Sequence, residues 1–130
     1  MNIHDTYLHI ERLTLKASQT KDARIAEKAI VLAQELAASQ TADEWHCFAA
    51  LVTALKLRSK YGLDFTTALL DISARLEKSS LDPARKKARR KNLAAIAQKH
   101  IDDPSVAAWL KDQDLTFTAT DLAPLLNESR

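Results

Sequence analysis

A single glycine, Gly62, occurs in this chain of 130 residues. Glycine supplies most of the positive-φ positions that tight hairpin turns and phosphate-cradling loops require. P-loops, dinucleotide-binding folds and nucleophile elbows each need more than one glycine in a short motif. The sequence therefore excludes these large enzyme classes and favours a fold that does not depend on tight turns.

Length and composition predict a single helical domain over residues 1–130. Hydrophobic residues make up 46% of the chain and charged residues 28%. A chain of this length buries roughly two-thirds of its unfolded surface, which is enough for a core without a disulfide or a structural metal. The one cysteine, Cys47, cannot form an internal disulfide, and the sequence shows neither a signal peptide nor a membrane span. We therefore expect a cytoplasmic protein with no membrane association.

Helical periodicity runs through most of the chain. In the segment 21–39 the apolar residues of one stripe fall on a single helical face, at Ile25, Ala29, Leu32 and Leu36. Comparable stripes follow in 45–55 and 65–76, and 4–17 has a less regular one. The sequence thus predicts an all-α fold, a compact irregular bundle of about five to seven helices. Because predicted helix starts recur about every twenty residues, a short solenoid of helical hairpins is the alternative.

Local signals predict where helices begin and end. Thr41-Ala-Asp-Glu44 has the form of a capping box with Thr41 as the N-cap. Gly62 is suited to close the helix before it in the left-handed conformation. Further helix starts are predicted at Asp64 and at the Asp-Pro pairs 82–83 and 103–104.

The apolar stripes are expected to share one core. Its predicted members are Ile25, Leu32, Leu36, Trp45, Phe48, Val52, Leu55, Leu69, Ile72 and Leu76. Near the C-terminus, residues 115–118 alternate like a strand, but without a partner strand they predict an extended segment that docks on the helices. Residues 121–127 predict a short terminal helix.

A run of six cations in seven residues is the strongest functional signal: Arg85, Lys86, Lys87, Arg89, Arg90 and Lys91. On a helix beginning at Pro83 they spread over roughly two-thirds of the circumference, so most of the first two turns must face solvent. The strip left to bury holds Ala84, Ala88 and Ala95. Like charges one turn apart repel, and cations at a helix N-terminus oppose the macrodipole.

This unfavourable arrangement predicts a compensating anion. The candidates are nucleic-acid phosphate, an acidic protein surface, and the acidic C-terminal segment with Asp102, Asp103, Asp112, Asp114 and Asp121. A solvated charged face is the alternative without a partner. A helix-turn-helix around Gly62 is disfavoured, because residues 65–78 offer few side chains that read bases.

The function predicted from these features is that of a small non-catalytic binding or regulatory protein whose basic helix, about 83–100, docks nucleic-acid phosphates. The alternative is a protein-only interaction module, such as an adaptor, chaperone or inhibitor, that uses the same helix on an acidic partner. The four histidines (4, 9, 46 and 100) match no metal-binding spacing, and Cys47 is best explained by packing. We expect no catalytic residue, no metal and no cofactor, and homo-oligomers are compatible with the sequence.

Overall fold

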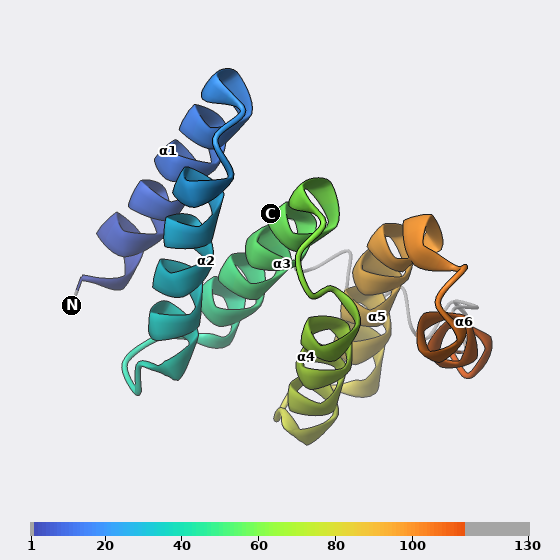
Figure 1. Ribbon diagram of the computed structural model, residues 1–130. Coiled ribbons are helices and arrows are strands. Elements are labelled where there is room, and N and C mark those ends of the chain that lie inside the picture. The colour runs from blue at the N-terminus through green and yellow to red at the C-terminus, as the bar shows by residue number, and fades with distance from the viewer. Residues whose placement is uncertain (1, 114–130) are drawn as a thin grey trace. The chain divides into compact units, whose positions relative to one another are not determined.

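The structure, a computed structural model, describes residues 2–113, and this part of the chain is all-α (Figure 1). It holds six α-helices, a number within the predicted range of five to seven, and one 3₁₀ turn. They are α1 (Ile3–Thr20), α2 (Ala23–Ala38), α3 (Glu44–Tyr61), α4 (Thr66–Lys78), α5 (Pro83–Ala97), η1 (Gln98–His100) and α6 (Pro104–Lys111). The predicted extended segment 115–118 and terminal helix 121–127 lie outside the described residues.

Backbone contacts divide the chain into two units, Met1–Phe65 and Thr66–Arg130. The first unit contains α1, α2 and α3, and the second contains α4, α5, η1 and α6. A single domain over residues 1–130 stays a prediction.

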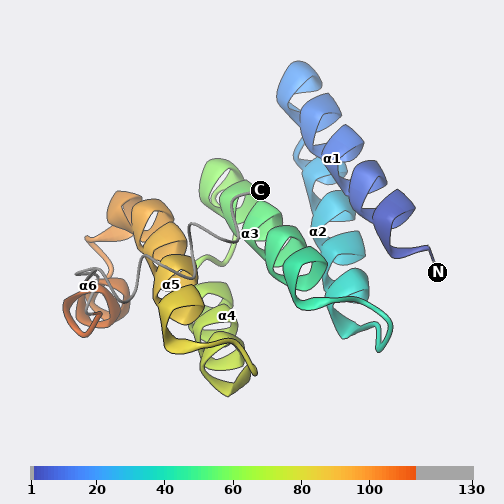
Figure 2. The same cartoon turned by 180° about the vertical axis from the view of Figure 1, so that it is seen from behind.

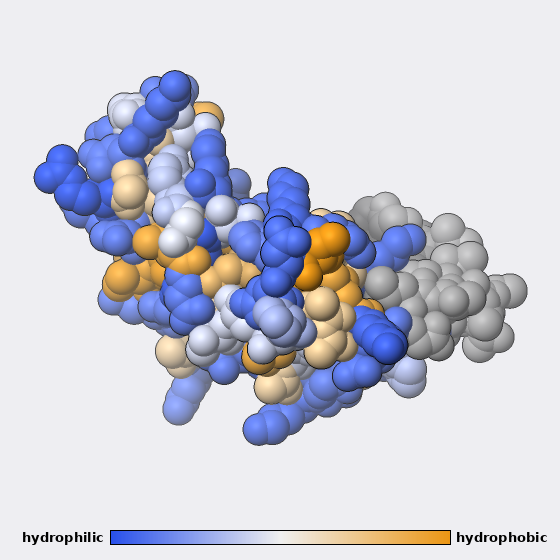
Figure 3. Space-filling model, turned by 45° about the vertical axis from the view of Figure 1, so that its right-hand side comes forward, coloured by the Kyte–Doolittle hydropathy of each residue, from blue (hydrophilic) through white to orange (hydrophobic). Residues whose placement is uncertain are grey.

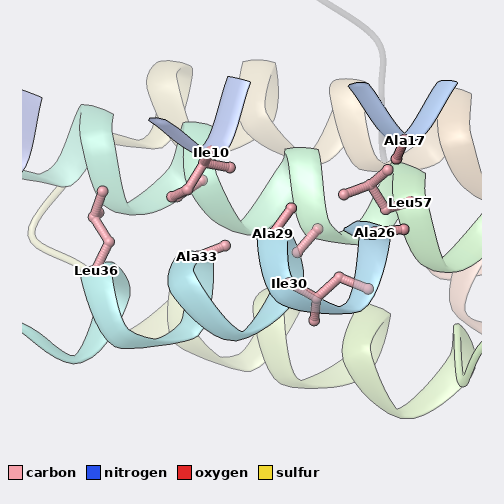
Figure 4. Close-up of a cluster of buried hydrophobic side chains, with 10 residues drawn as sticks. Ile10, Ala17, Ala26, Ala29, Ile30, Ala33, Leu36 and Leu57 are labelled. Atoms are coloured by element: carbon pink, nitrogen blue, oxygen red, sulfur yellow. The ribbon is translucent and has the colours of Figure 1, made fainter. Parts of the chain in front are cut away.

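In the first unit, three helices pack in chain order, with α2 in contact with both α1 and α3 (Figures 1 and 2). Small side chains line the buried face of α2: Ala26, Ala29 and Ala33 have no exposed surface. Ile10 of α1 and Leu57 of α3 belong to the same buried cluster (Figure 4). Because alanine carries only a methyl group, neighbouring helices can approach α2 closely on both sides.

The predicted burial of the core residues is partly right, whereas a core shared by all ten stays a prediction, because they fall in both units. Five of its members are buried: Leu36, Leu55, Leu69, Ile72 and Leu76. Four others are only partly buried: Ile25, Leu32, Phe48 and Val52. The prediction is wrong for Trp45, which stands in the first turn of α3 and is 49% exposed, although its ring packs edge-on against those of Tyr7 and His46.

The helix ends of the first unit show one wrong prediction and one confirmed one. The N-cap of α3 is Asp43, whose carboxylate accepts the backbone N–H of His46 at 2.8 Å. The capping box at Thr41 is therefore wrong, and the Thr41 hydroxyl instead lies 3.0 Å from that of Ser39. Gly62 closes α3 as predicted, at φ 67°, with its N–H donated to the carbonyl of Arg58.

In the second unit, α4 and α5 form an antiparallel hairpin, and α6 packs on α5 (Figures 1 and 2). The indole N–H of Trp109 on α6 donates to the Ser73 hydroxyl on α4 at 2.9 Å. The Asp-Pro signals are confirmed, with an Asp N-cap and a Pro in the first turn of both α5 and α6. α4 begins at Thr66, two residues after Asp64, and Asp64 as its N-cap stays a prediction.

Candidate nucleic-acid interface

All six predicted cations lie on α5, within its first nine residues, and α5 carries no acidic residue. The helix is buried through Ala84, Leu93, Ala94 and Ala97. The predicted burial of Ala95 is wrong, because Ala95 is exposed. Ala95 is two residues from both Leu93 and Ala97, which places it on the opposite side of the helix from them. The apolar face of α5 is therefore set by its second half.

The cations are less exposed than the charge pattern predicts. Lys91 is exposed, but the other five are partly buried, and the Arg90 side chain is only 18% exposed. The prediction that most of the first two turns face solvent is wrong for these five residues. Long Arg and Lys side chains can bury their aliphatic stems on the protein while the charged group reaches a polar partner.

Glu77, in the last turn of α4, is one such partner. Its carboxylate accepts a hydrogen bond from the guanidinium of Arg90, and its backbone carbonyl accepts one from Lys86 Nζ at 2.8 Å. The carbonyls of a last helical turn have no partner within their own helix. Lys86 and Arg90 thus connect the start of α5 with the end of α4 through hydrogen bonds to Glu77.

Asp82 offsets the cations at the N-terminus of α5. One carboxylate oxygen accepts the backbone N–H of Arg85 at 2.9 Å, and the other accepts from the Arg85 guanidinium. These contacts, the backbone one first, hold the pKa of Asp82 below its ordinary value. An N-cap carboxylate also complements the helix dipole, which the cations oppose.

Among the described residues 2–113, Glu77 and Asp82 of the α4–α5 hairpin are two anions that contact cations of α5. Among the acidic residues predicted from the C-terminal segment, Asp103 accepts hydrogen bonds from the Thr66 hydroxyl and the Ser105 N–H. These bonds, the hydroxyl first, lower the pKa of Asp103. Asp114 and Asp121 lie outside the described residues. The contact of Asp82 with Arg85 could be predicted from the sequence, because the two residues are three positions apart. The contacts of Glu77 with Lys86 and Arg90 could not, because they depend on how α4 and α5 align in the hairpin.

Neither Cys47 nor the histidines form a recognisable catalytic site. Within residues 2–113, no group of three or more His, Cys, Asp or Glu side chains could hold a metal ion. The Cys47 thiol is partly buried and lies 3.9 Å from the carbonyls of Ala37 and Ala42. Two histidines do meet, since His4 Nδ1 lies 3.4 Å from His46 Nε2.

The face of the molecule drawn in Figure 3 is mostly hydrophilic. Figure 3 shows polar side chains interrupted by small apolar patches, and the large exposed hydrophobic residues are Leu8, Leu15, Val31, Trp45, Leu70 and Ile101. None of the helices in residues 2–113 combines the length and the hydropathy that crossing a membrane demands.

Comparisons with known proteins give the chain no family. No family model matches it, and no curated protein and no solved structure is significantly similar to it. Its function can therefore be inferred only from its own side chains.

Proposed function

We propose that this chain is a small non-catalytic binding or regulatory protein whose helix α5 docks on nucleic-acid phosphates. The density of positive charge carries the proposal. From Glu77 to Lys91 the chain has seven Lys and Arg residues against two carboxylates. Lys and Arg bind phosphate through charge-assisted hydrogen bonds, and a basic stripe along one helix is the usual electrostatic footprint of a nucleic-acid-binding protein.

The ion pairs within the hairpin do not oppose this function. The Glu77 side chain is 56% exposed, although that of Arg90 is only 18% exposed, so the partner that a phosphate would replace is open to solvent. A phosphate offers Arg90 the same kind of charge-assisted hydrogen bonds as the carboxylate and can therefore take its place. The stretch from Arg85 to Lys91 contains no aromatic residue. We therefore expect contacts with the phosphate backbone that do not depend on base sequence.

An acidic protein is the second candidate partner. The hydrogen bonds that Arg85 and Arg90 donate to Asp82 and Glu77 favour it, because these guanidinium groups already pair with carboxylates. In this case the chain would be an adaptor, chaperone or inhibitor that uses the same helix. The single thiol, Cys47, fits a reducing compartment, and we propose the cytoplasm for either function.

The salt dependence of duplex binding tests the proposal. Releasing counterions makes log K fall with log salt at a slope of roughly −0.9 per phosphate contact, so four to six contacts give about −4 to −5. The test variant replaces Lys87, Arg89 and Lys91 with Gln and keeps Lys86 and Arg90, which hold α4. It should flatten the slope by about 3 and weaken binding to all sequences alike.

A matched control removes the same charge elsewhere: Lys16, Lys28 and Lys56, all exposed in the first unit, become Gln. The control should bind as the parent does, and circular dichroism should show unchanged helix content in both variants. Equal binding by parent and test variant, or no binding by the parent at low salt, would refute the proposal. Binding of polyglutamate without binding of nucleic acid would establish the acidic-partner alternative.

A further inference from the structure

Two histidines that are 42 residues apart in the sequence meet in the first unit. His4 stands in the first turn of α1 and is exposed, while His46 stands in the first turn of α3 and is partly buried. Their rings are almost perpendicular, at 83°, with centroids 5.6 Å apart. The contact joins two helix starts, so each imidazole is carried by a regular element rather than by a loop.

The separation of the facing nitrogens suits a shared metal ion. His4 Nδ1 and His46 Nε2 are 3.4 Å apart, longer than the usual range of hydrogen bonds donated by N–H groups. Zinc binds imidazole nitrogen at about 2.0–2.1 Å with tetrahedral angles, which places two ligand nitrogens about 3.3–3.4 Å apart. The two imidazoles are therefore spaced as two ligands of one ion.

Asp43 orients the second imidazole. Its Oδ1 lies 2.7 Å from His46 Nδ1 and can only accept, so Nδ1 is the donor, and in the neutral imidazole the lone pair is then on Nε2, the nitrogen that faces His4. The same oxygen accepts the backbone N–H of His46 at 2.8 Å, so two hydrogen bonds hold the carboxylate against this imidazole. A carboxylate behind a ligating histidine is the usual outer-shell partner in zinc sites.

Aromatic rings hold His46 further in place. The Trp45 ring lies 5.0 Å from that of His46 between centroids, and the Tyr7 ring lies 5.7 Å away, both edge-on. We propose that His4 and His46 bind a divalent late transition-metal ion, with zinc as the probe and water in the remaining positions. Imidazole ligands suit zinc, copper and nickel, whereas magnesium prefers oxygen ligands.

Zinc titration of the full chain by calorimetry, with thermal unfolding as a second readout, tests this site. Zinc should bind saturably at about neutral pH and raise the melting temperature, since a ligand of the folded state stabilises it. Magnesium should do neither. His4→Ala, an exposed change, should weaken zinc binding at least about tenfold, as expected for the loss of one of two protein ligands. His9→Ala, which removes another exposed histidine of α1, should bind zinc as the parent does.

Two more variants separate the site from its surroundings. Asp43→Asn keeps a good N-cap for α3 but should weaken zinc binding about tenfold, as outer-shell changes do. Cys47→Ser should leave zinc affinity unchanged, which excludes the neighbouring thiol as the ligand. The proposal is overturned if the parent binds no zinc, or if His4→Ala and His9→Ala have the same zinc affinity as the parent. None of these results depends on α5 or on nucleic-acid binding.

Discussion

Leu36→Ala is the sharpest test of the packing in the first unit. Leu36 lies near the end of α2 and has no exposed surface. The change removes about three methylene equivalents, each worth about 0.8 kcal/mol of transfer free energy. The space left behind adds a cavity cost, because α1 and α3 are already held against the small residues of α2. We therefore expect the free energy of unfolding to fall by about 3–5 kcal/mol, the upper range for buried leucines.

Urea unfolding followed by circular dichroism measures this loss, with Val31→Ala as the matched control. Val31 stands on the same helix but is 51% exposed, so its truncation should change the free energy of unfolding by less than about 0.5 kcal/mol. A loss below about half a kcal/mol for Leu36→Ala, or equal losses for the two variants, would refute the assignment of the buried face of α2.

Two further predictions concern the helix ends. Gly62→Ala should lower the free energy of unfolding, measured in urea, by about 1 kcal/mol, because φ at this position is positive. A clash is not the cause, since nothing lies within 4 Å of an added Cβ. An unchanged free energy of unfolding would contradict this prediction. The N-cap residues Asp43, Asp82 and Asp103 have pKa values below the ordinary carboxyl value, because hydrogen bonds in the folded state favour the charged carboxylate. The stability that they provide is therefore present above about pH 4, and it is lost as the pH falls through their folded-state pKa values. Replacing all three with Asn, which also caps helices, should flatten the decline of melting temperature below about pH 4, and an unaltered acid profile would show that these carboxylates are not responsible.

The predicted helix ends that were correct depend on one residue and its immediate neighbours. A Pro suits the first helical position, which makes the Asp directly before it the N-cap, and Gly62 is the only glycine that can take the left-handed position. The wrong prediction at Thr41 arose where two capping residues compete. Thr41 and Asp43 are both good N-caps, and the sequence alone does not show which of them the chain between α2 and α3 brings to the start of α3.

The candidate interface was predictable in its charges but not in its contacts. Six cations in seven residues are visible in any reading of the sequence. That Lys86 and Arg90 reach Glu77 follows only from the antiparallel pairing of α4 and α5, which brings residues nine and thirteen positions apart together. A helical projection of α5 alone cannot show these contacts, and it exaggerated the exposure of the cations.

Spacing motifs could not predict the contact of His4 with His46. Such motifs detect ligands that share one helix or one loop, whereas these two imidazoles come from the starts of different helices. Their meeting requires α1 and α3 to touch across α2, and the contacts between α1 and α3 show that they do. The alanines of α2 are a physical reason for this approach, because methyl side chains leave little bulk to hold the flanking helices apart. The alanines that let α1 and α3 approach each other have no functional group in their side chains. A search restricted to histidines, cysteines and carboxylates would therefore not consider them.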